Sequence, residues 1–461
     1  MSELRKDSLS FLEVLGQSIA NVSPTFTPAL AVTVVAGMAG TASWLVYVLA
    51  TIAMIVVGLN VGKLAAQITS AGSFFIYVSR SLGPGLGLLS GWAMLAAYIF
   101  TAATLTVATS IFLNTLLQII GLPFVIPGYV VYALVSLLIW YFAVRDIRMS
   151  SRIGLILEGV SVLAIILVCV FVWSKTGFKA DAKQIHLDGA NLASVAQAIV
   201  FGIFSFVGFE SAASLGQETR DPKRKIPLAV ILSPALAGAF FVFTSYILVL
   251  AFGDDTAKLG TSASPLGDVT TGDSQILAIL VYAGATLSSF ACALASLNAY
   301  GRTLFSLGRY SFFHASVGVV HTHHKTPYTA LTVGAFINLF LCVAFYGRAE
   351  SDLVGYFGTV ATFGFIVVYF LVSVSAPVFL KKIGQVKTAD YVVGALGAVF
   401  MVLALVGSLY PVPAYPYNVL PYLFALYLMV GVVWFFIVKA RAPGALLSIE
   451  HDLEVAIAQA A

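Results

Sequence analysis

The sequence is poor in charged residues and in cysteine. Charged residues make up 10% of its 461 residues, whereas a soluble domain carries about 25%. Hydrophobic residues make up 60%, so the chain lacks the polar surface of a water-soluble protein and is predicted to lie in a membrane. The three cysteines, Cys169, Cys292 and Cys342, all fall in apolar segments, so we expect neither a disulfide framework nor a metal cluster.

Motifs for catalysis and for nucleotide binding are also missing. Nothing resembles a nucleophile–base pair or an ATP-binding loop, so we expect no enzyme, no catalytic residue and no cofactor. The glycine-rich string at 83–87 follows no predicted strand and is not a nucleotide cradle. His321, His323 and His324 lack the cysteine or carboxylate that would complete a metal site. The basic run at 223–225 indicates topology and attraction to the inner leaflet, not nucleic-acid binding.

Apolar segments long enough to cross a bilayer recur along the chain. A transmembrane helix needs roughly 20 apolar residues, and about twelve such segments can be counted. The predicted fold class is therefore an all-α polytopic membrane protein with about twelve transmembrane helices. The predicted spans are 12–37, 42–67, 86–118, 125–144, 153–174, 194–217, 228–252, 276–308, 328–346, 353–379, 391–409 and 420–440.

Basic residues gather in every second loop. All but five of the 24 fall on the side that the N-terminus shares, and the five opposite are Lys175, Lys179, Lys183, Lys258 and Arg348. Cytoplasmic loops carry an excess of lysine and arginine, so both termini are predicted to lie in the cytoplasm. The protein is then a multi-pass protein of the cytoplasmic (plasma) membrane, with the lipid bilayer as its surroundings.

The sixth predicted span breaks the apolar pattern. Its sequence FGIFSFVGFESAAS (201–214) places Gly208 and Glu210 inside the membrane. A carboxylate there costs at least about 2.5 kcal/mol, so it normally faces a cavity or a partner. Glycine lets the helix loosen, which frees the backbone carbonyls near Phe206 to Gly208 as ligands. This stretch predicts a broken transmembrane helix with a binding site at the break.

The first predicted span is interrupted in a similar way. SIANVSPTFTPAL (18–30) places several polar residues around Pro24, which removes a backbone donor. The alternative is a proline kink that serine and threonine side chains heal. Interrupted spans at corresponding positions of two halves mark the midplane site of a transporter, and this pairing favours a binding site.

Three stretches resemble the amino acid–polyamine–organocation superfamily of secondary transporters. GFESAASLGQETRDPKRKIP (208–227) is similar to the sixth span of that family and the loop after it, and it is the most specific stretch. AGSFFIYVSRSLGPGLGLLSGW (71–92) resembles the passage from the second to the third span, and SLNAYGRTLFSLGR (296–309) resembles the end of the eighth. The resemblance covers spans one to ten and indicates an amino acid permease.

This resemblance implies a leucine-transporter-like fold, with a five-plus-five inverted repeat and broken first and sixth helices. The family's first span usually breaks at a glycine-rich run, whereas this chain has Asn-Val-Ser-Pro-Thr, which leaves the contact with the substrate's carboxylate less defined. The implied parts are a cytoplasmic N-terminus (1–11), a first repeat (12–174), a second repeat (194–379), two peripheral helices (391–440) and a cytoplasmic tail (441–461).

The two breaks together predict a site for a free α-amino acid. A half-helix that begins after Ser23 and Pro24 offers N–H groups and a positive dipole end to a carboxylate, while freed carbonyls accept the ammonium group. Aromatic residues near the breaks are candidates for side-chain specificity, although aromatics in membrane helices mostly serve packing. The candidate substrate-binding residues are Asn21, Val22, Ser23, Pro24, Thr25, Tyr98, Phe204, Phe206, Val207, Gly208, Phe209 and Phe290.

Two intramembrane acids are candidates for proton coupling. Glu210 lies at the second break, where a low dielectric disfavours a charged carboxylate, so it could bind a proton on one side and release it on the other. It could instead stay protonated and hold the break together by a hydrogen bond. Glu158, in the fifth span, could carry a proton, bond to a serine or threonine, or reach cytoplasmic water from the inner end of its helix.

Coupling to sodium and exchange of substrates are the alternatives. Proton-coupled members of the family can carry a lysine in span five in place of a sodium ion, and span five of this chain has none. Ser288 and Ser289 could supply hydroxyl oxygens to a sodium ion near the first break. We expect H+ as the coupling ion, in symport or antiport.

The expected function is transport of amino acids across the cytoplasmic membrane by alternating access. A transporter of polyamines or other cationic amines is the main alternative, in which Glu210 and Glu158 would hold ammonium groups directly. A membrane enzyme or a channel is a third class, but the chain lacks a catalytic constellation and a repeated pore motif.

The charge pattern gives a testable topology. Cysteines introduced near Lys179 and Asp254 should react with a membrane-impermeant thiol reagent from outside the cell, because their loops are poor in basic residues. Cysteines near Arg148 and Lys325 should react only from the inside. Labelling in intact cells and in inside-out vesicles measures the difference, and the reverse pattern would overturn the orientation.

Overall fold

The computed structural model of the chain describes residues 4, 7–145, 147–262, 264–270 and 275–441. Every regular element in these residues is helical, and the only β-type pairings among them are isolated bridges, Leu9 with Thr219 and Tyr346 with Arg348. A helix satisfies its own backbone hydrogen bonds, as a segment surrounded by lipid must. The predicted all-α fold class is confirmed. Of the predicted cytoplasmic tail (441–461), all but Arg441 lies outside the described residues.

Nine segments of the described chain are long and apolar enough to cross a membrane, which confirms a polytopic membrane protein. The first, Phe11–Gln67, contains α1 (Phe11–Val22), α2 (Val32–Ala39) and α3 (Ser43–Gln67). Each of the others corresponds to one helix. These are α5 (Pro84–Ile119), α6 (Gly128–Arg145), α7 (Ile147–Lys175), α10 (Pro222–Ala251), α13 (Gln275–Arg309), α15 (Glu350–Lys382), α16 (Thr388–Leu409) and α17 (Leu420–Arg441).

Two shorter apolar helices, α9 (Leu192–Phe204) and α14 (Tyr328–Ala344), fall on the predicted ranges 194–217 and 328–346. Six other short helices connect the long ones. They are η2 (Gly40–Ala42), α4 (Ser73–Leu82), α8 (Ala182–His186), α11 (Thr256–Thr261), α12 (Pro265–Thr270) and η4 (Ala315–Gly318).

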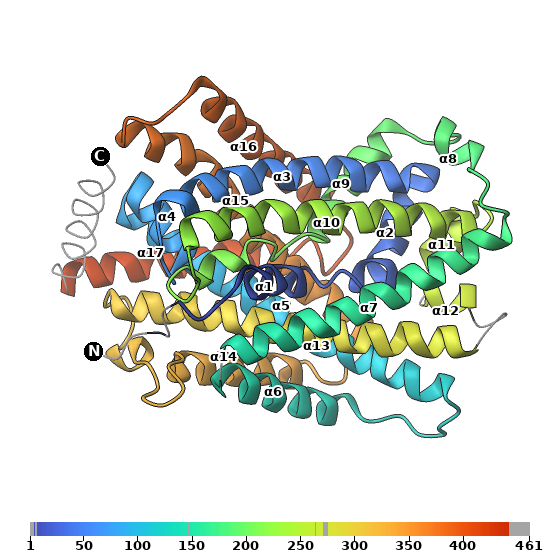
Figure 1. Cartoon of the computed structure of the whole chain (residues 1–461), viewed down its shortest axis with the longest axis horizontal. Coiled ribbons are helices and arrows are strands. Elements are labelled where there is room, and N and C mark those ends of the chain that lie inside the picture. The colour runs from blue at the N-terminus through green and yellow to red at the C-terminus, as the bar shows by residue number, and fades with distance from the viewer. Residues whose placement is uncertain (1–3, 5–6, 146, 263, 271–274, 442–461) are drawn as a thin grey trace.

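The long helices run side by side in one general direction (Figure 1). At one end of the bundle lie α8, α11 and α12, and at the opposite end lie α4 and the last turns of α17 (Figure 1). The helices therefore form a single bundle whose ends carry the connections, which is the arrangement that a polytopic protein needs in a bilayer.

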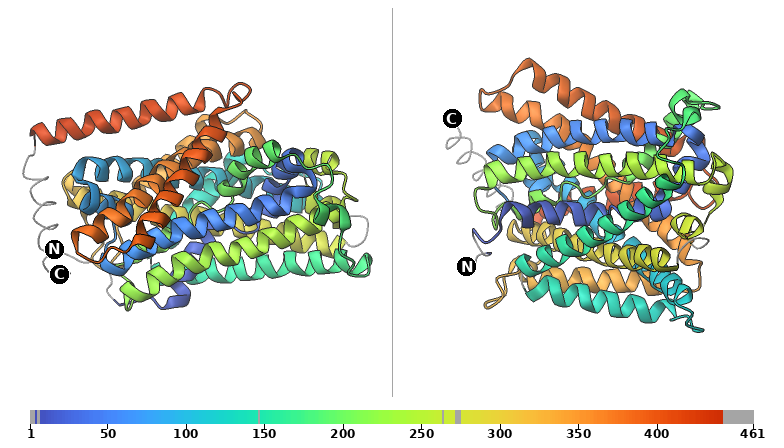
Figure 2. Two further views of the ribbon diagram at one scale, coloured as in Figure 1. Left: turned by 90° about the horizontal axis from the view of Figure 1, so that it is seen from above. Right: turned by 45° about the vertical axis from the view of Figure 1, so that its right-hand side comes forward.

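Burial separates central from peripheral helices. In the most apolar window of α5, 89% of the residues are buried inside the protein, against 22% in α16 and 17% in α17. Figure 2 shows α17, in red, along the outside of the bundle. The central helix α5 packs against α13 and α15. These three unbroken helices form the centre of the bundle, and α13 also packs against α1.

Glycine lets pairs of helices approach closely. A Cβ atom on Gly58 of α3 would lie 2.8 Å from the carbonyl oxygen of Val230 in α10, and one on Gly364 of α15 would lie 2.8 Å from that of Ala93 in α5. Small residues at such contacts are typical of membrane bundles, where packing replaces the hydrophobic effect between helices.

Both interrupted helices lie where the sequence predicted them. α1 ends at Val22, Ser23 has a left-handed φ of 49°, and a π-turn, η1 (Thr27–Ala31), leads into α2. α9 ends at Phe204, Gly208 has a φ of 94°, and a 3-10 helix, η3 (Ser211–Leu215), follows. The predicted span 194–217 therefore ends as an α-helix earlier than expected, because the conformation of Gly208 does not belong to a helix.

Candidate functional site

Asn21 joins the two breaks. Its Nδ2 donates a hydrogen bond to the carbonyl oxygen of Gly208 over 3.3 Å, and its side chain is buried. A Cβ atom on Gly208 would lie 2.5 Å from that Nδ2, so a glycine is needed for the two segments to approach this closely. The first and second breaks therefore lie side by side in the interior of the bundle.

Two side chains of helix α13 hold Asn21 in place. Ser296 Oγ donates to Asn21 Oδ1 over 2.5 Å, and Cys292 Sγ donates to the carbonyl oxygen of Asn21 over 3.2 Å. The NH2 group of the Asn21 amide therefore bonds to the second break and its oxygen bonds to α13, which sets the orientation of the amide.

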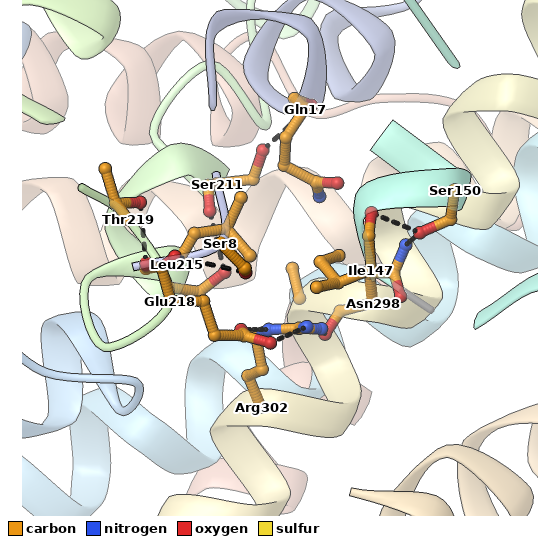
Figure 3. Close-up of polar contacts among 12 residues, drawn as sticks. Ser8, Gln17, Ile147, Ser150, Ser211, Leu215, Glu218, Thr219, Asn298 and Arg302 are labelled. Atoms are coloured by element: carbon orange, nitrogen blue, oxygen red, sulfur yellow. Dashed lines mark hydrogen bonds and ion pairs between the residues drawn. The ribbon is translucent and has the colours of Figure 1, made fainter. Parts of the chain in front are cut away.

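Further hydrogen bonds tie α1 to η3 beside the breaks. Ser211 Oγ donates to the carbonyl oxygen of Gln17 over 3.2 Å (Figure 3), and the N–H of Ala212 donates to Ser18 Oγ over 3.1 Å. Gln17 Nε2 donates to the carbonyl oxygen of Ala295 in α13 over 2.9 Å. The bond to Ser18 satisfies the N–H of Ala212 near the start of η3, and the other two bonds reach carbonyl oxygens inside α1 and α13 and hold the segments together.

A small cavity lies at the breaks, bordered by α5, α13 and α15. Its volume is about 20 Å³, which is room for about one water molecule. No charged side chain occurs among the described residues that line it. They are Asn21, Val22, Ser23, Phe26, Thr101, Thr104, Leu105, Phe204, Ser205, Val207, Cys292 and Gly358.

The first break forms a tight turn around Pro24. The N–H of Phe26 donates to the carbonyl oxygen of Ser23 over 3.0 Å. The hydroxyls of Thr25 and Thr27 are buried and have no hydrogen-bond partner among the described residues. Leaving a buried hydroxyl unbonded costs about 1–3 kcal/mol, so these two are suited to bind water or a polar ligand group. Of the predicted site residues at this break, Pro24 and Thr25 do not line the cavity.

The carbonyls of the second break are less free than the sequence suggested. The carbonyl oxygen of Phe206 accepts the N–H of Phe209 over 3.3 Å, and that of Gly208 accepts Asn21. The prediction of unbonded carbonyls is wrong for these two. The turn satisfies one lone pair of Phe206, and the carbonyl oxygen of Gly208 also accepts the N–H of Ser211 over 3.0 Å, so both of its lone pairs are used. Val207 is the residue of this turn that lines the cavity.

Glu210 is fully buried and is held by two tyrosines. The hydroxyl of Tyr98, on α5, donates to Oε1 over 2.8 Å, and the hydroxyl of Tyr369, on α15, donates to Oε2. The Tyr369 hydroxyl also accepts the N–H of Gly208 over 3.3 Å. One carboxyl group therefore joins two unbroken helices to the second break. It does not line the cavity.

Glu158, on α7, belongs to a separate buried cluster. Ser288 Oγ lies 2.8 and 2.9 Å from its two carboxyl oxygens and 3.1 Å from Ser23 Oγ at the first break. The side chain of Glu158 is 1% exposed, so the interpretation that it reaches cytoplasmic water is wrong. Ser289 donates to the carbonyl oxygen of Ala285 in its own helix over 2.5 Å. Ser288 therefore contacts the first break, and Ser289 bonds within its helix.

Of the five aromatic candidates, only one lines the cavity. Phe204 lines the cavity, whereas Tyr98 bonds to Glu210 behind it. The other three rings pack against aromatic neighbours and do not line the cavity. The pairs are Phe206 with Phe241 (5.0 Å between ring centroids), Phe209 with Tyr369 (5.4 Å) and Phe290 with Phe142 (6.3 Å).

Sequence reasoning missed the cavity residues on unbroken helices. Thr101 and Thr104, three residues apart on α5, line the cavity on one helix face. This threonine pair in an apolar span is a signal that could have identified them. Nothing in the sequence marks Gly358, where an added Cβ would lie 2.8 Å from the ring of Phe204. Nor does anything mark Tyr369, which is 159 residues from its partner Glu210.

Comparison with known proteins identifies the family. The model of the amino acid permease family matches residues 13–443. The chain belongs to the amino acid permease family. It is therefore a membrane transporter and not an enzyme, and the resemblance noted from its motifs is confirmed.

Several relatives are transporters with different named substrates. The low-affinity putrescine importer PlaP of Escherichia coli (strain K12) is 26% identical over 332 residues, which cover 69% of this chain and 71% of that protein. The branched-chain amino acid permease BcaP of Bacillus subtilis (strain 168) is 25% identical over 305 residues, or 62% of this chain and 63% of the permease. The methylthioribose transporter of the same organism is 21% identical over 389 residues, 77% of each chain.

The contact between the breaks gives a stability prediction. Gly208→Ala should destabilise the permease by about 2 kcal/mol more than Gly384→Ala does, because both positions have a positive φ but only Gly208 faces a neighbour. Thermal unfolding of the purified variants measures the two effects. Equal losses would mean that backbone conformation, and not the approach of Asn21, makes glycine necessary at the second break.

Proposed function

We propose that this permease is a secondary active transporter that carries neutral amino acids across the cytoplasmic membrane by alternating access. The observation that supports this proposal is the cavity at the two breaks, whose described lining carries no charged side chain. A zwitterion has two charges that backbone dipoles and neutral polar groups can balance, so it needs no charged residue in its site.

The polar groups at the breaks suit the two ends of a free amino acid. Ser23 lines the cavity at the first break, and the unbonded hydroxyls of Thr25 and Thr27 lie in the adjoining turn, which supports binding of the carboxylate there. At the second break, the carbonyl oxygens of Phe206 and Val207 retain lone pairs for the ammonium group. Phe204 and the threonines of α5 then border the side chain of the substrate.

A polyamine transporter is the second candidate, because one relative is a putrescine importer. That function requires a carboxylate within reach of an ammonium group in the cavity. The oxygens of Glu210 are occupied by two tyrosine hydroxyls, and those of Glu158 face Ser288. Neither acid lines the cavity, which favours the amino acid over the polyamine.

Alternating access is consistent with the size of the cavity. A volume of about 20 Å³ holds about one water molecule, so an amino acid enters only when the helices around the breaks move apart. We place the five-plus-five inverted repeat at 12–174 and 194–379, within about twelve spans, because each half then opens with an interrupted helix. The low burial of α16 and α17 supports a peripheral place for 391–440. We propose from the charge pattern that both termini lie in the cytoplasm.

Glu210 is the proposed carrier of the coupling proton. As a carboxylate it accepts from both tyrosines, but once protonated it must donate through one oxygen, so one of the two tyrosine contacts has to reorganise. Protonation would therefore change the contact between the second break and α5 or α15. Glu158 is the alternative carrier, since Ser288 connects it to Ser23 at the first break. Ser289 bonds to its own helix, which removes one of the two proposed sodium ligands, so we propose a proton as the coupling ion.

Ligand-induced stabilisation tests the substrate class. Neutral amino acids at saturating concentration should raise the Tm of the purified permease, because a ligand at 100 times its Kd stabilises the folded state by about 2.7 kcal/mol. Putrescine should leave the Tm unchanged. Competition for uptake in proteoliposomes provides the second measurement. Stabilisation by putrescine without any response to amino acids would instead establish the polyamine function.

Glutamine variants test proton coupling. Glu210→Gln should still bind and exchange substrate but should lose accumulation driven by a pH gradient, because the amide cannot take up the proton. Glu158→Gln, the matched variant of the other buried acid, should keep that accumulation. Uptake by proteoliposomes with and without an imposed pH gradient measures both. Retained gradient-driven accumulation in Glu210→Gln, with loss in Glu158→Gln, would assign the proton to Glu158.

A further inference from the structure

A buried ion pair lies near the breaks, toward the N-terminal segment (Figure 3). Arg302 Nε lies 2.7 Å from Glu218 Oε2, and Arg302 Nη2 lies 3.1 Å from Glu218 Oε1. The two side chains are 1% and 0% exposed. A two-point contact between a guanidinium and a carboxylate is strong and geometrically specific, and here it is shielded from water.

Glu218 also anchors the residues that precede α1. Its carbonyl oxygen accepts the N–H groups of Ser8 and Leu9 over 2.9 and 3.0 Å. Arg220 adds two bonds, from its N–H to the carbonyl oxygen of Leu9 over 3.1 Å and from Nε to that of Asp7 over 2.7 Å. We call residues 7–10 the strap. The strap is continuous with α1, which begins at Phe11.

Arg302 is held by unbroken helices. It lies on α13, and its Nη1 donates to the carbonyl oxygen of Asn298 one turn earlier over 3.1 Å. Asn298 Nδ2 donates to Ser150 Oγ, near the start of α7, over 3.1 Å. Figure 3 shows this chain of contacts from Glu218 through Arg302 and Asn298 to Ser150. The guanidinium is therefore positioned by two long helices that have no break.

The segments connected to Glu218, on the opposite side of the ion pair from α13, all adjoin the breaks. The strap leads into α1, which ends at the first break, and Glu218 follows η3, which comes directly after the second. Hydrogen bonds from Ser211 and Ala212 tie η3 to α1, so the strap, α1, η3 and Glu218 form one connected unit. The ion pair joins that unit to α13.

We propose that the Glu218–Arg302 ion pair is a lock that keeps the cavity closed on the side of the N-terminal segment. Movement of α1 and η3 away from α13 separates two buried charges, so it requires water to reach both groups. The strap reinforces the lock because it holds the backbone of Glu218 in place. This proposal rests on the alternating-access function proposed above and adds the step that opens one side.

Cys292 is a built-in reporter of that opening. It lines the cavity and is buried, and the other cysteines, Cys169 and Cys342, can be replaced with alanine. Glu218→Gln keeps the shape of the side chain but removes the charge, so α1 and η3 should separate from α13 more often. We expect a small membrane-impermeant thiol reagent to label Cys292 roughly tenfold faster from the side of the N-terminus. The labelling rate follows the fraction of molecules that are open, so a tenfold larger open fraction gives tenfold faster labelling.

Two further variants keep the test decisive. If Glu218→Gln fails to fold because Arg302 remains charged and buried, the double variant Glu218→Gln/Arg302→Gln removes both charges and should show the same faster labelling. Arg220→Gln removes an exposed contact to the strap and should give a smaller increase. Its matched control is Arg224→Gln, which removes the same charge at an exposed position in the first turn of α10 and should have no effect.

The control for charge loss at an ion pair is Asp390→Asn. Asp390 pairs with Lys63 of α3 over 2.5 Å, away from both breaks, so its removal should leave Cys292 labelling unchanged. Unchanged labelling in folded Glu218→Gln and in the double variant would overturn the proposal, as would an equal increase in Asp390→Asn. Because labelling needs no substrate, this outcome is independent of whether neutral amino acids stabilise the protein.

Discussion

Polar backbone groups in an apolar interior need hydrogen-bond partners, and this permease exposes such groups where two helices are interrupted. The turns at the breaks satisfy several of these groups, and Asn21 adds a bond from one break to the other. Its side chain bonds the carbonyl oxygen of Gly208 on one side and the hydroxyl of Ser296 on the other. The breaks can therefore exist only beside each other and beside α13. The cavity, the buried acids and the strap all take their places from this arrangement.

The membrane fold could be predicted from the sequence because it follows from composition and length. Helices are the elements that lipid permits, and long apolar segments mark them without knowledge of their partners. The breaks were also visible, since Pro24 and Gly208 sit among polar residues where the pattern should be apolar. The end of α9 at Phe204 could not be predicted, because apolar residues continue into the turn after it, and the shape of that turn depends on Asn21 in another segment.

The site was predictable only where it lies on the broken helices. Ser23, Val207 and Phe204 line the cavity, and each is next to a break in the chain. Phe209 was chosen for the same reason but packs on Tyr369, because position along the chain does not tell which way a side chain points once the helix has ended. Residues on α5 and α15 reach the site through packing, and among them the pair Thr101 and Thr104 left a sequence signal whereas Gly358 left none.

Glu158, Glu210 and Glu218 are buried and connect to the segments at the breaks, and their partners give them different properties. Glu210 and Glu158 face hydroxyl groups, which can either donate or accept, so their hydrogen bonds can be rearranged when a proton arrives. Glu218 faces a guanidinium, which is always charged and only donates, so this pair can separate but cannot exchange donor for acceptor. Hydroxyl partners thus suit a response to protons, and the arginine partner suits a mechanical joint. The proton coupling proposed above needs both, since binding of a proton would have to be converted into movement of α1 and η3.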